Sequence, residues 1–294
     1  MTSKTRWVLS AALLVLGMAG LPGRAAAQPD GFLSGNIKYN SGQSVQPIFE
    51  GWTKNPDGTI NFWFGYLNRN HVEELSIPVG ANNQFEPGDA DRGQPAYFYP
   101  RFNRQLFAVT VPANWGQKEL IWTVVANGKS ERAVGWVRPD WEIAPPGTKA
   151  EVNDGNKPPV LKASAPSTAS LTAPLTLTAN VTDDGLPKAR ANGGGPRKRP
   201  SGPPAFDYDG KLPPPVNVPQ VEPPARPKVD GRLQVTWFVW RGPAAVTFAP
   251  AAVGADKGPA ISAASFTKPG EYVLRARATD GQAFSVQDVK VTVK

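Results

Sequence analysis

The sequence predicts an all-β protein of two β-sandwich domains, and three observations carry that prediction. Proline and glycine together account for 61 of the 294 residues. Tryptophan, tyrosine and phenylalanine add another 28. Beyond the N-terminal leader, no sustained stretch places its apolar residues at helical spacing. Short strands that pack aromatic side chains and connect through Pro/Gly turns have this composition.

Residues 1–27 have the three parts of a secretory signal peptide. Lys4 and Arg6 supply the positive charge, residues 7–21 form a short apolar stretch, and Ala25-Ala26-Ala27 offers a cleavage site. The apolar stretch is short for a membrane span, and no later segment is apolar enough to cross a bilayer. We therefore expect a mature chain that begins at Gln28, is exported, and has no transmembrane segment.

Residues 31–143 are predicted to form an aromatic-rich first β-sandwich. In residues 105–111, the side chains of Phe107, Val109 and Val111 fall on one face of a strand. Two strand-like runs, 119–126 and 129–137, flank an Asn127-Gly128 pair. Asn-Gly favours a type I′ turn, so these runs predict a β-hairpin.

A polar linker, residues 144–158, separates this domain from a second one at residues 159–294. Residues 175–181 and 271–278 alternate apolar with polar side chains, as expected where one face of a strand is buried and the other is solvated. Residues 186–230 interrupt the second domain with 12 prolines, eight basic residues and four acidic ones. This composition predicts a disordered, Pro-rich basic insertion.

The second domain resembles the PKD/REJ-like, cadherin-like branch of bacterial immunoglobulin-like modules. The resemblance rests on residues 176–187, 233–248, 264–281 and 289–293, which include Trp237 on a central strand and a Pro-Gly-x-Tyr turn that ends in Tyr272. It implies a structural or adhesive module without catalytic residues. Trp237 is expected in the core, and Tyr272 is placed like the tyrosine of a tyrosine corner. The first domain resembles no family that its motifs identify.

Two candidate sites emerge from the sequence. Asp183, Asp184 and Asp280 lie in loops at one end of the predicted second sandwich and could bind Ca²⁺, although Asp-Gly pairs also simply make turns. The first domain offers a possible aromatic platform for carbohydrate, although aromatic side chains also fill sandwich cores. Its proposed members are Trp63, Tyr66, Trp115 and Trp141.

The composition excludes several classes of function. The chain has no cysteine and one histidine, which excludes thiol catalysis and thiolate metal sites. No nucleophile motif is present. We expect a non-catalytic structural or adhesion-type binding protein in the periplasm or outside a bacterial cell, with an envelope polysaccharide or a protein as partner.

Two further expectations concern partners. The alternative function is a carbohydrate-binding or carbohydrate-active envelope protein that uses the first domain. The basic run Arg197-Lys198-Arg199 could contact an anionic surface or simply keep its segment extended. Nucleic-acid binding is not expected, because the chain is exported and this charge is confined to one loop.

Overall fold

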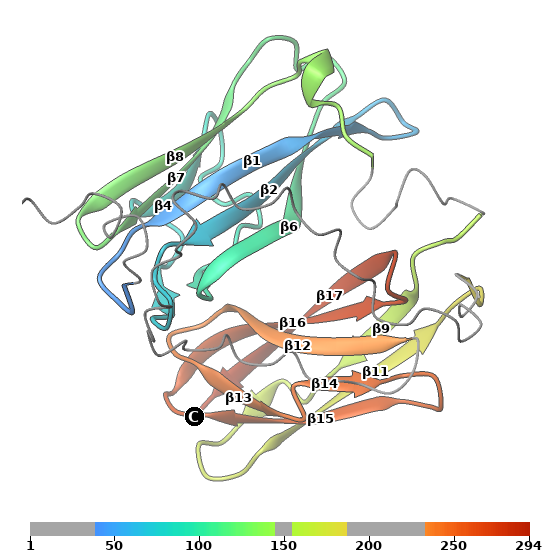
Figure 1. The fold of residues 1–294 in the computed structure, drawn as a ribbon. Coiled ribbons are helices and arrows are strands. Elements are labelled where there is room, and N and C mark those ends of the chain that lie inside the picture. The colour runs from blue at the N-terminus through green and yellow to red at the C-terminus, as the bar shows by residue number, and fades with distance from the viewer. Residues whose placement is uncertain (1–38, 145–154, 187–232) are drawn as a thin grey trace, which may run out of the picture. The chain divides into compact units, whose positions relative to one another are not determined.

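The computed structural model describes residues 39–144, 155–186 and 233–294 (Figure 1). Outside these residues lie the leader, the start of the first domain and most of the linker. The same is true of nearly all of the 186–230 insertion, including Arg197, Lys198 and Arg199. Residues 39–294 belong to one compact unit. The described part is all-β, with seventeen strands and one short 3-10 helix, η2 (Pro139–Trp141). The predicted fold class is confirmed.

The first sandwich contains two three-stranded antiparallel sheets and a two-stranded one. One sheet has the order β1-β2-β6 and another β4-β7-β8, while β3 pairs with β5. The bounds are β1 (Val45–Lys54), β2 (Ile60–Asn68), β3 (Leu75–Ser76), β4 (Asn83–Glu86), β5 (Tyr97–Phe98), β6 (Arg101–Val111), β7 (Leu120–Ala126) and β8 (Lys129–Gly135).

The predicted hairpin is the connection from β7 to β8. Asn127 and Gly128 have φ values of 49° and 74°, the left-handed conformation that a type I′ turn requires at both central positions. Leu120 to Ala126 pair in register with Gly135 to Lys129. Asn and Gly adopt positive φ more readily than other residues, so this local signal sufficed to predict the turn.

The second sandwich has the strand order of an immunoglobulin-like fold. One sheet runs β13-β15-β11-β9 and the other β10-β17-β16-β12-β14, with β10 parallel to β17. The bounds are β9 (Val160–Ser164), β10 (Thr168–Ala169), β11 (Leu175–Thr182), β12 (Gln234–Arg241), β13 (Val246–Ala249), β14 (Ala252–Gly254), β15 (Ala260–Phe266), β16 (Gly270–Thr279) and β17 (Phe284–Val293).

Trp237 and Tyr272, which the sequence places in the core and at a tyrosine corner, both lie where they are expected. Trp237 on β12 is 2% exposed and lies in the core between the two sheets. Tyr272 opens β16, and its hydroxyl donates to the carbonyl of Lys268, four residues upstream, at 2.9 Å. This is the hydrogen bond of a tyrosine corner. The alternating apolar residues of β11 and β16 are buried as predicted, apart from the half-buried Val181. The opposite face of β16 is not solvated throughout, because Arg275 is buried there against Trp240.

The end of β12 contributes to the core of the first sandwich as well as to that of the second. Strand alternation places Trp240, like Phe238, on the face of β12 opposite Trp237 and Val239, and the register of β12 against β16 shifts between Val239 and Arg241. Trp240 is 3% exposed and belongs to the hydrophobic core of the first sandwich, where its ring meets Phe107 edge-on at 5.8 Å. Conversely, Tyr97 from the first sandwich belongs to the core of the second. Each core therefore contains a side chain from the other sandwich.

Candidate functional sites

The four residues proposed as an aromatic platform do not gather on one surface. Tyr66 is 1% exposed, and its hydroxyl accepts a hydrogen bond from the backbone N–H of Tyr99 at 2.8 Å. Its ring meets Phe98 edge-on in the core. Tyr66 therefore cannot present a stacking face to a ligand, because strand alternation directs it inward together with Phe62 and Phe64.

Trp63 points to the opposite face of β2 and is half-buried. Its indole N–H donates to the Thr53 hydroxyl on β1 at 3.0 Å, so the side chain reaches across the neighbouring strand. Trp63 is thereby separated from the core-directed residues of β2.

Trp115 and Trp141 lie at the end of the first sandwich where β6 and β8 finish. Trp115 is half-buried, meets Phe62 edge-on and donates its indole N–H to the carbonyl of Lys118. Trp141, in η2, is 41% exposed. Its ring stacks on Phe49 with 25° between the planes and 5.6 Å between centroids.

Trp141 has the geometry that ring stacking on a ligand requires. One face of the indole is fixed against Phe49, and Trp136 meets its edge at 5.9 Å. The segment is held in place because Ile143 donates its N–H to the carbonyl of Trp52 at 2.9 Å. Of the four proposed aromatic residues, Trp141 alone is exposed.

The three aspartates proposed for calcium each accept hydrogen bonds from backbone N–H groups. Asp280 accepts the N–H groups of Gln282 and Ala283 at 2.6 and 2.7 Å, and its other oxygen accepts from the Asn156 amide. Asp184 accepts from the N–H groups of Lys157 and Leu186, and Asp183 from that of Gly185. Within the described residues, no three His, Cys, Asp or Glu side chains form a group able to hold a metal ion. The structure therefore does not bring the three carboxylates together.

A buried carboxyl group on the first sandwich was not singled out from the sequence. Glu50 sits in a β-bulge of β1, where the pairing with β2 shifts between Phe49 and Gly51. Its side chain is only 10% exposed. One oxygen accepts the N–H of Gln105 at 2.5 Å, whereas Oε1 lies 3.7 Å from Nε of Arg104 and has no hydrogen bond.

Desolvation dominates the titration of Glu50. Burial raises the pKa of its carboxyl group above the ordinary value, against the opposing effects of the Gln105 N–H and the Arg104 charge. Glycoside cleavage requires a pair of carboxyl groups, and no second carboxyl group among the described residues contributes to this shift. The Glu-Gly pair is the only sequence signal for the bulge, since glycine is common at such positions.

Two bidentate ion pairs lie beside Trp240. Arg241 donates two hydrogen bonds to the carboxylate of Asp91, at 2.8 and 2.7 Å, and a third to the carbonyl of Gln94. These bonds lower the pKa of Asp91 to about 2. Arg275 lies over the Trp240 ring at 3.3 Å and is itself paired with Asp288. A cation over an indole and a bidentate ion pair both hold Trp240 in place.

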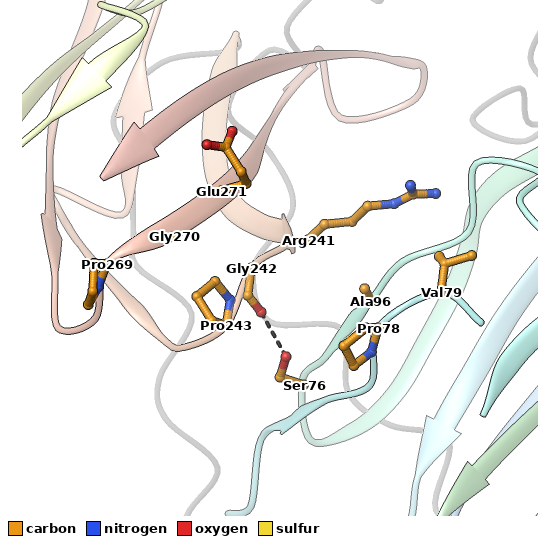
Figure 2. Close-up of a pocket in the computed structure, with 10 residues that line it drawn as sticks. All are labelled: Ser76, Pro78, Val79, Ala96, Arg241, Gly242, Pro243, Pro269, Gly270 and Glu271. Atoms are coloured by element: carbon orange, nitrogen blue, oxygen red, sulfur yellow. Dashed lines mark hydrogen bonds between the residues drawn. The ribbon is translucent and has the colours of Figure 1, made fainter. Parts of the chain in front are cut away.

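A mostly apolar cavity of about 360 Å³ lies beside these contacts (Figure 2). Its lining residues are Ser76, Pro78, Val79, Ala96, Arg241, Gly242, Pro243, Pro269, Gly270 and Glu271. The Ser76 hydroxyl donates to the carbonyl of Gly242 at 2.8 Å, and Figure 2 shows Arg241 and Glu271 extending in different directions. The Ser76 hydroxyl is thus engaged by a backbone carbonyl, and Glu271 is the single carboxylate among the lining residues.

Comparison with known proteins gives no family. No protein-family model and no curated protein matches the chain. Among solved structures, the D00-D0 domain of intimin aligns with 85% of this chain and 100% of its own length, at 12% identity and a TM-score of 0.28.

Two further solved structures belong to longer proteins, and each aligns with this chain over a small part of its own length. An endo-fucoidan hydrolase of glycoside hydrolase family 107 aligns over 88% of this chain and 28% of its own, with 11% identity and a TM-score of 0.23. Native E. coli alpha-2-macroglobulin aligns with 85% of this chain over 16% of its own length, at 12% identity and a TM-score of 0.23. Similarities this low carry no argument about function.

The strands themselves define the class of protein. It is an all-β protein of β-sandwich type, and its second sandwich is immunoglobulin-like in strand order, core tryptophan and tyrosine corner. Within the described residues, no helix is both long and apolar enough to cross a membrane.

Proposed function

We propose that this chain is an exported, non-catalytic structural or binding protein of adhesion type, located in the periplasm or on the exterior of a bacterial cell. Its second domain would be a PKD-like module. One observation carries the proposal: Trp240, at the end of a strand of the second sandwich, is part of the core of the first. Buried apolar contacts between consecutive sandwiches limit their relative motion, which suits a protein that holds a binding surface at a fixed position.

The joining contacts support a mechanical or positioning role in physical terms. Inter-domain contacts that permit relative motion are usually small and polar. Here the two sandwiches are joined by the buried Trp240 and by the bidentate Arg241–Asp91 pair. The N–H of Ala96 adds a hydrogen bond to the Trp240 carbonyl at 2.9 Å.

The proposal is tested by fractionation and a binding assay. The chain is expressed with its leader in a Gram-negative host, and the processed form, beginning at Gln28, is expected outside the cytoplasm. The purified mature chain should then bind isolated cell envelopes saturably and without releasing hydrolysis products. An unprocessed chain in the cytoplasm, or turnover of envelope polysaccharide, would overturn the proposal.

Carbohydrate binding is a second candidate function, and the exposed, stacked ring of Trp141 favours it. Stacking of a sugar on an indole quenches or shifts tryptophan fluorescence. Titration of the mature chain with soluble envelope polysaccharide should therefore give a saturable fluorescence change that is lost in Trp141→Ala. Phe102→Ala removes another exposed aromatic side chain, one that is 57% exposed, and should leave the titration unchanged. Equal effects of both substitutions would argue against a site at Trp141.

A further inference from the structure

Two arginines on β16 have the same position relative to the sheet but different partners. Arg275 and Arg277 both project from the outer face, on either side of the buried Ala276. Opposite Arg275, β17 places Asp288, which accepts two hydrogen bonds from the guanidinium at 2.7 and 2.8 Å. Opposite Arg277, β17 places Val286, whose side chain is 41% exposed. The second arginine thus lacks the carboxylate that the first one has.

Among the residues that the structure describes, none replaces that carboxylate at Arg277. Its guanidinium lies 4.0 Å from the centre of the Phe284 ring, and its Nε is buried without a hydrogen-bond partner. On the other side, β12 places Thr236 opposite it. Burial lowers the pKa of Arg277, which reflects the loss of hydration around the charge. A half-buried cation without a counter-charge is unfavourable, so an anionic group that reaches it would gain binding free energy.

We propose that Arg277, together with the apolar side chains of Phe284 and Val286, forms a docking site for a partner protein that presents an acidic side chain beside an apolar one. The carboxylate would bind the two terminal nitrogens of the Arg277 guanidinium, since Nε is buried. Arginine favours such two-point hydrogen bonding, and arginine next to an aromatic ring is typical of the energetically dominant residues of interfaces.

Two observations favour a protein over an acidic polysaccharide. The guanidinium already covers a face of the Phe284 ring, so that face is not available for stacking on a sugar. The exposed Val286 offers an apolar contact that a polar polymer would leave unused. This site is on the second sandwich and does not depend on Trp141 or on the export of the chain, so its failure would leave the proposed function standing.

The test uses the mature chain and a defined probe, a random copolymer of glutamate and tyrosine, with polygalacturonate as the saccharide comparison. Arg277→Gln should weaken copolymer binding by at least about tenfold, because one partner of a desolvated charge pair is removed. Arg132→Gln removes the same charge from an exposed position on β8 and should have little effect.

Val286→Asp provides the sharper test. It places a carboxylate directly opposite Arg277, which should satisfy the guanidinium internally, raise the midpoint of thermal unfolding and abolish copolymer binding. Val286→Asn has the same shape without the charge and should retain most of the binding.

Four results would overturn the assignment. The first is that Arg277→Gln and Arg132→Gln weaken copolymer binding equally, and the second is that Val286→Asp binds the copolymer as well as the unsubstituted chain does. The third is that the unsubstituted chain binds polygalacturonate more tightly than the copolymer, and the fourth is that it does not bind the copolymer at all. The thermal unfolding of each variant shows whether it is folded, so that a loss of binding is not mistaken for a loss of structure.

Discussion

The Tyr272 hydroxyl links the start of β16 to the turn that precedes it. Because the ring is buried and the hydroxyl donates to the Lys268 carbonyl, the residue contributes both apolar packing and one hydrogen bond. The ring also meets Phe266 edge-on at 4.9 Å, which ties β15 to β16. The two contributions can be separated by removing the hydroxyl alone.

Tyr272→Phe should lower the free energy of unfolding by about 0.5–1.5 kcal/mol, the usual net value of one hydrogen bond. Urea denaturation followed by tryptophan fluorescence measures the change. Tyr39→Phe removes a hydroxyl from an exposed ring and serves as the control. An equally small effect of both substitutions would show that the corner bond does not contribute to stability.

The Asp91–Arg241 pair predicts a dependence of stability on pH. The pKa of Asp91 is lowered to about 2 in the folded chain, below the value of about 3.9 for an unfolded aspartate. A lowered pKa in the folded state means that the pair stabilises the fold above about pH 4, and that this contribution is lost as the pH falls towards 2.

Asp91→Asn should therefore lower the melting temperature at pH 6, and the difference from the unsubstituted chain should shrink between pH 4 and pH 2. Differential scanning calorimetry across this range gives the comparison. Asp140→Asn, at an exposed residue of η2, should show no such convergence. A difference that persists to pH 2 would mean that the ion pair is not what the substitution removes.

At the scale of elements, a glutamine side chain joins the two sheets of the second sandwich. Gln287 on β17 accepts the backbone N–H of Ala163 at 2.8 Å and donates to the carbonyl of the same residue at 3.3 Å. Its amide thus takes the place of a partner strand along the outer edge of β9. An edge strand whose backbone groups are satisfied in this way is less open to pairing with other chains.

Gln287→Ala should speed the hydrogen exchange of the Ala163 amide, because its N–H loses its acceptor, with a loss of about 1 kcal/mol in stability. Amide exchange followed by NMR or mass spectrometry locates the effect on β9. Gln282→Ala, in the nearby loop, should leave the exchange of β9 unchanged. Unaltered protection of Ala163 in Gln287→Ala would show that the side-chain bridge is not formed in solution.

At the scale of the whole molecule, the exchange of Trp240 and Tyr97 between the two cores couples their stabilities. The polar linker suggests two domains that unfold independently, and a core substitution such as Trp237→Ala that damages only the second. The contacts instead predict a single cooperative transition for residues 39–294, because opening either core exposes an aromatic side chain of the other.

Trp240→Ala tests this coupling. It should cost roughly 3–5 kcal/mol, as expected for truncating a buried aromatic side chain, and should lower the stability of both sandwiches. Calorimetry should show one transition in the unsubstituted chain, whereas the variant should melt at a lower temperature or separate into two transitions. Two transitions in the unsubstituted chain, of which only one moves in Trp240→Ala, would show that the sandwiches unfold independently.

The sequence by itself determined the features that depend on local conformation and on period-two burial. Asn127-Gly128 specifies a positive-φ turn, and the alternation in β11 and β16 specifies their buried faces. Trp237 and Tyr272 were likewise placed correctly, because their positions follow from the strand pattern around them. The short strands β10 and β14 were missed, since two or three residues carry no measurable periodicity.

Only the tertiary structure decided which side chains meet. Strand alternation puts Trp240 on the outer face of β12, but the sequence does not show that this face meets the first sandwich through contacts with Gly93, Ala96 and Phe107, more than 130 positions away in the chain. The same holds for Arg277, which looks like any solvated arginine until the pairing of β16 with β17 places Val286, and no carboxylate, opposite it. Cross-strand partners are set by register, and register is a property of the folded sheet.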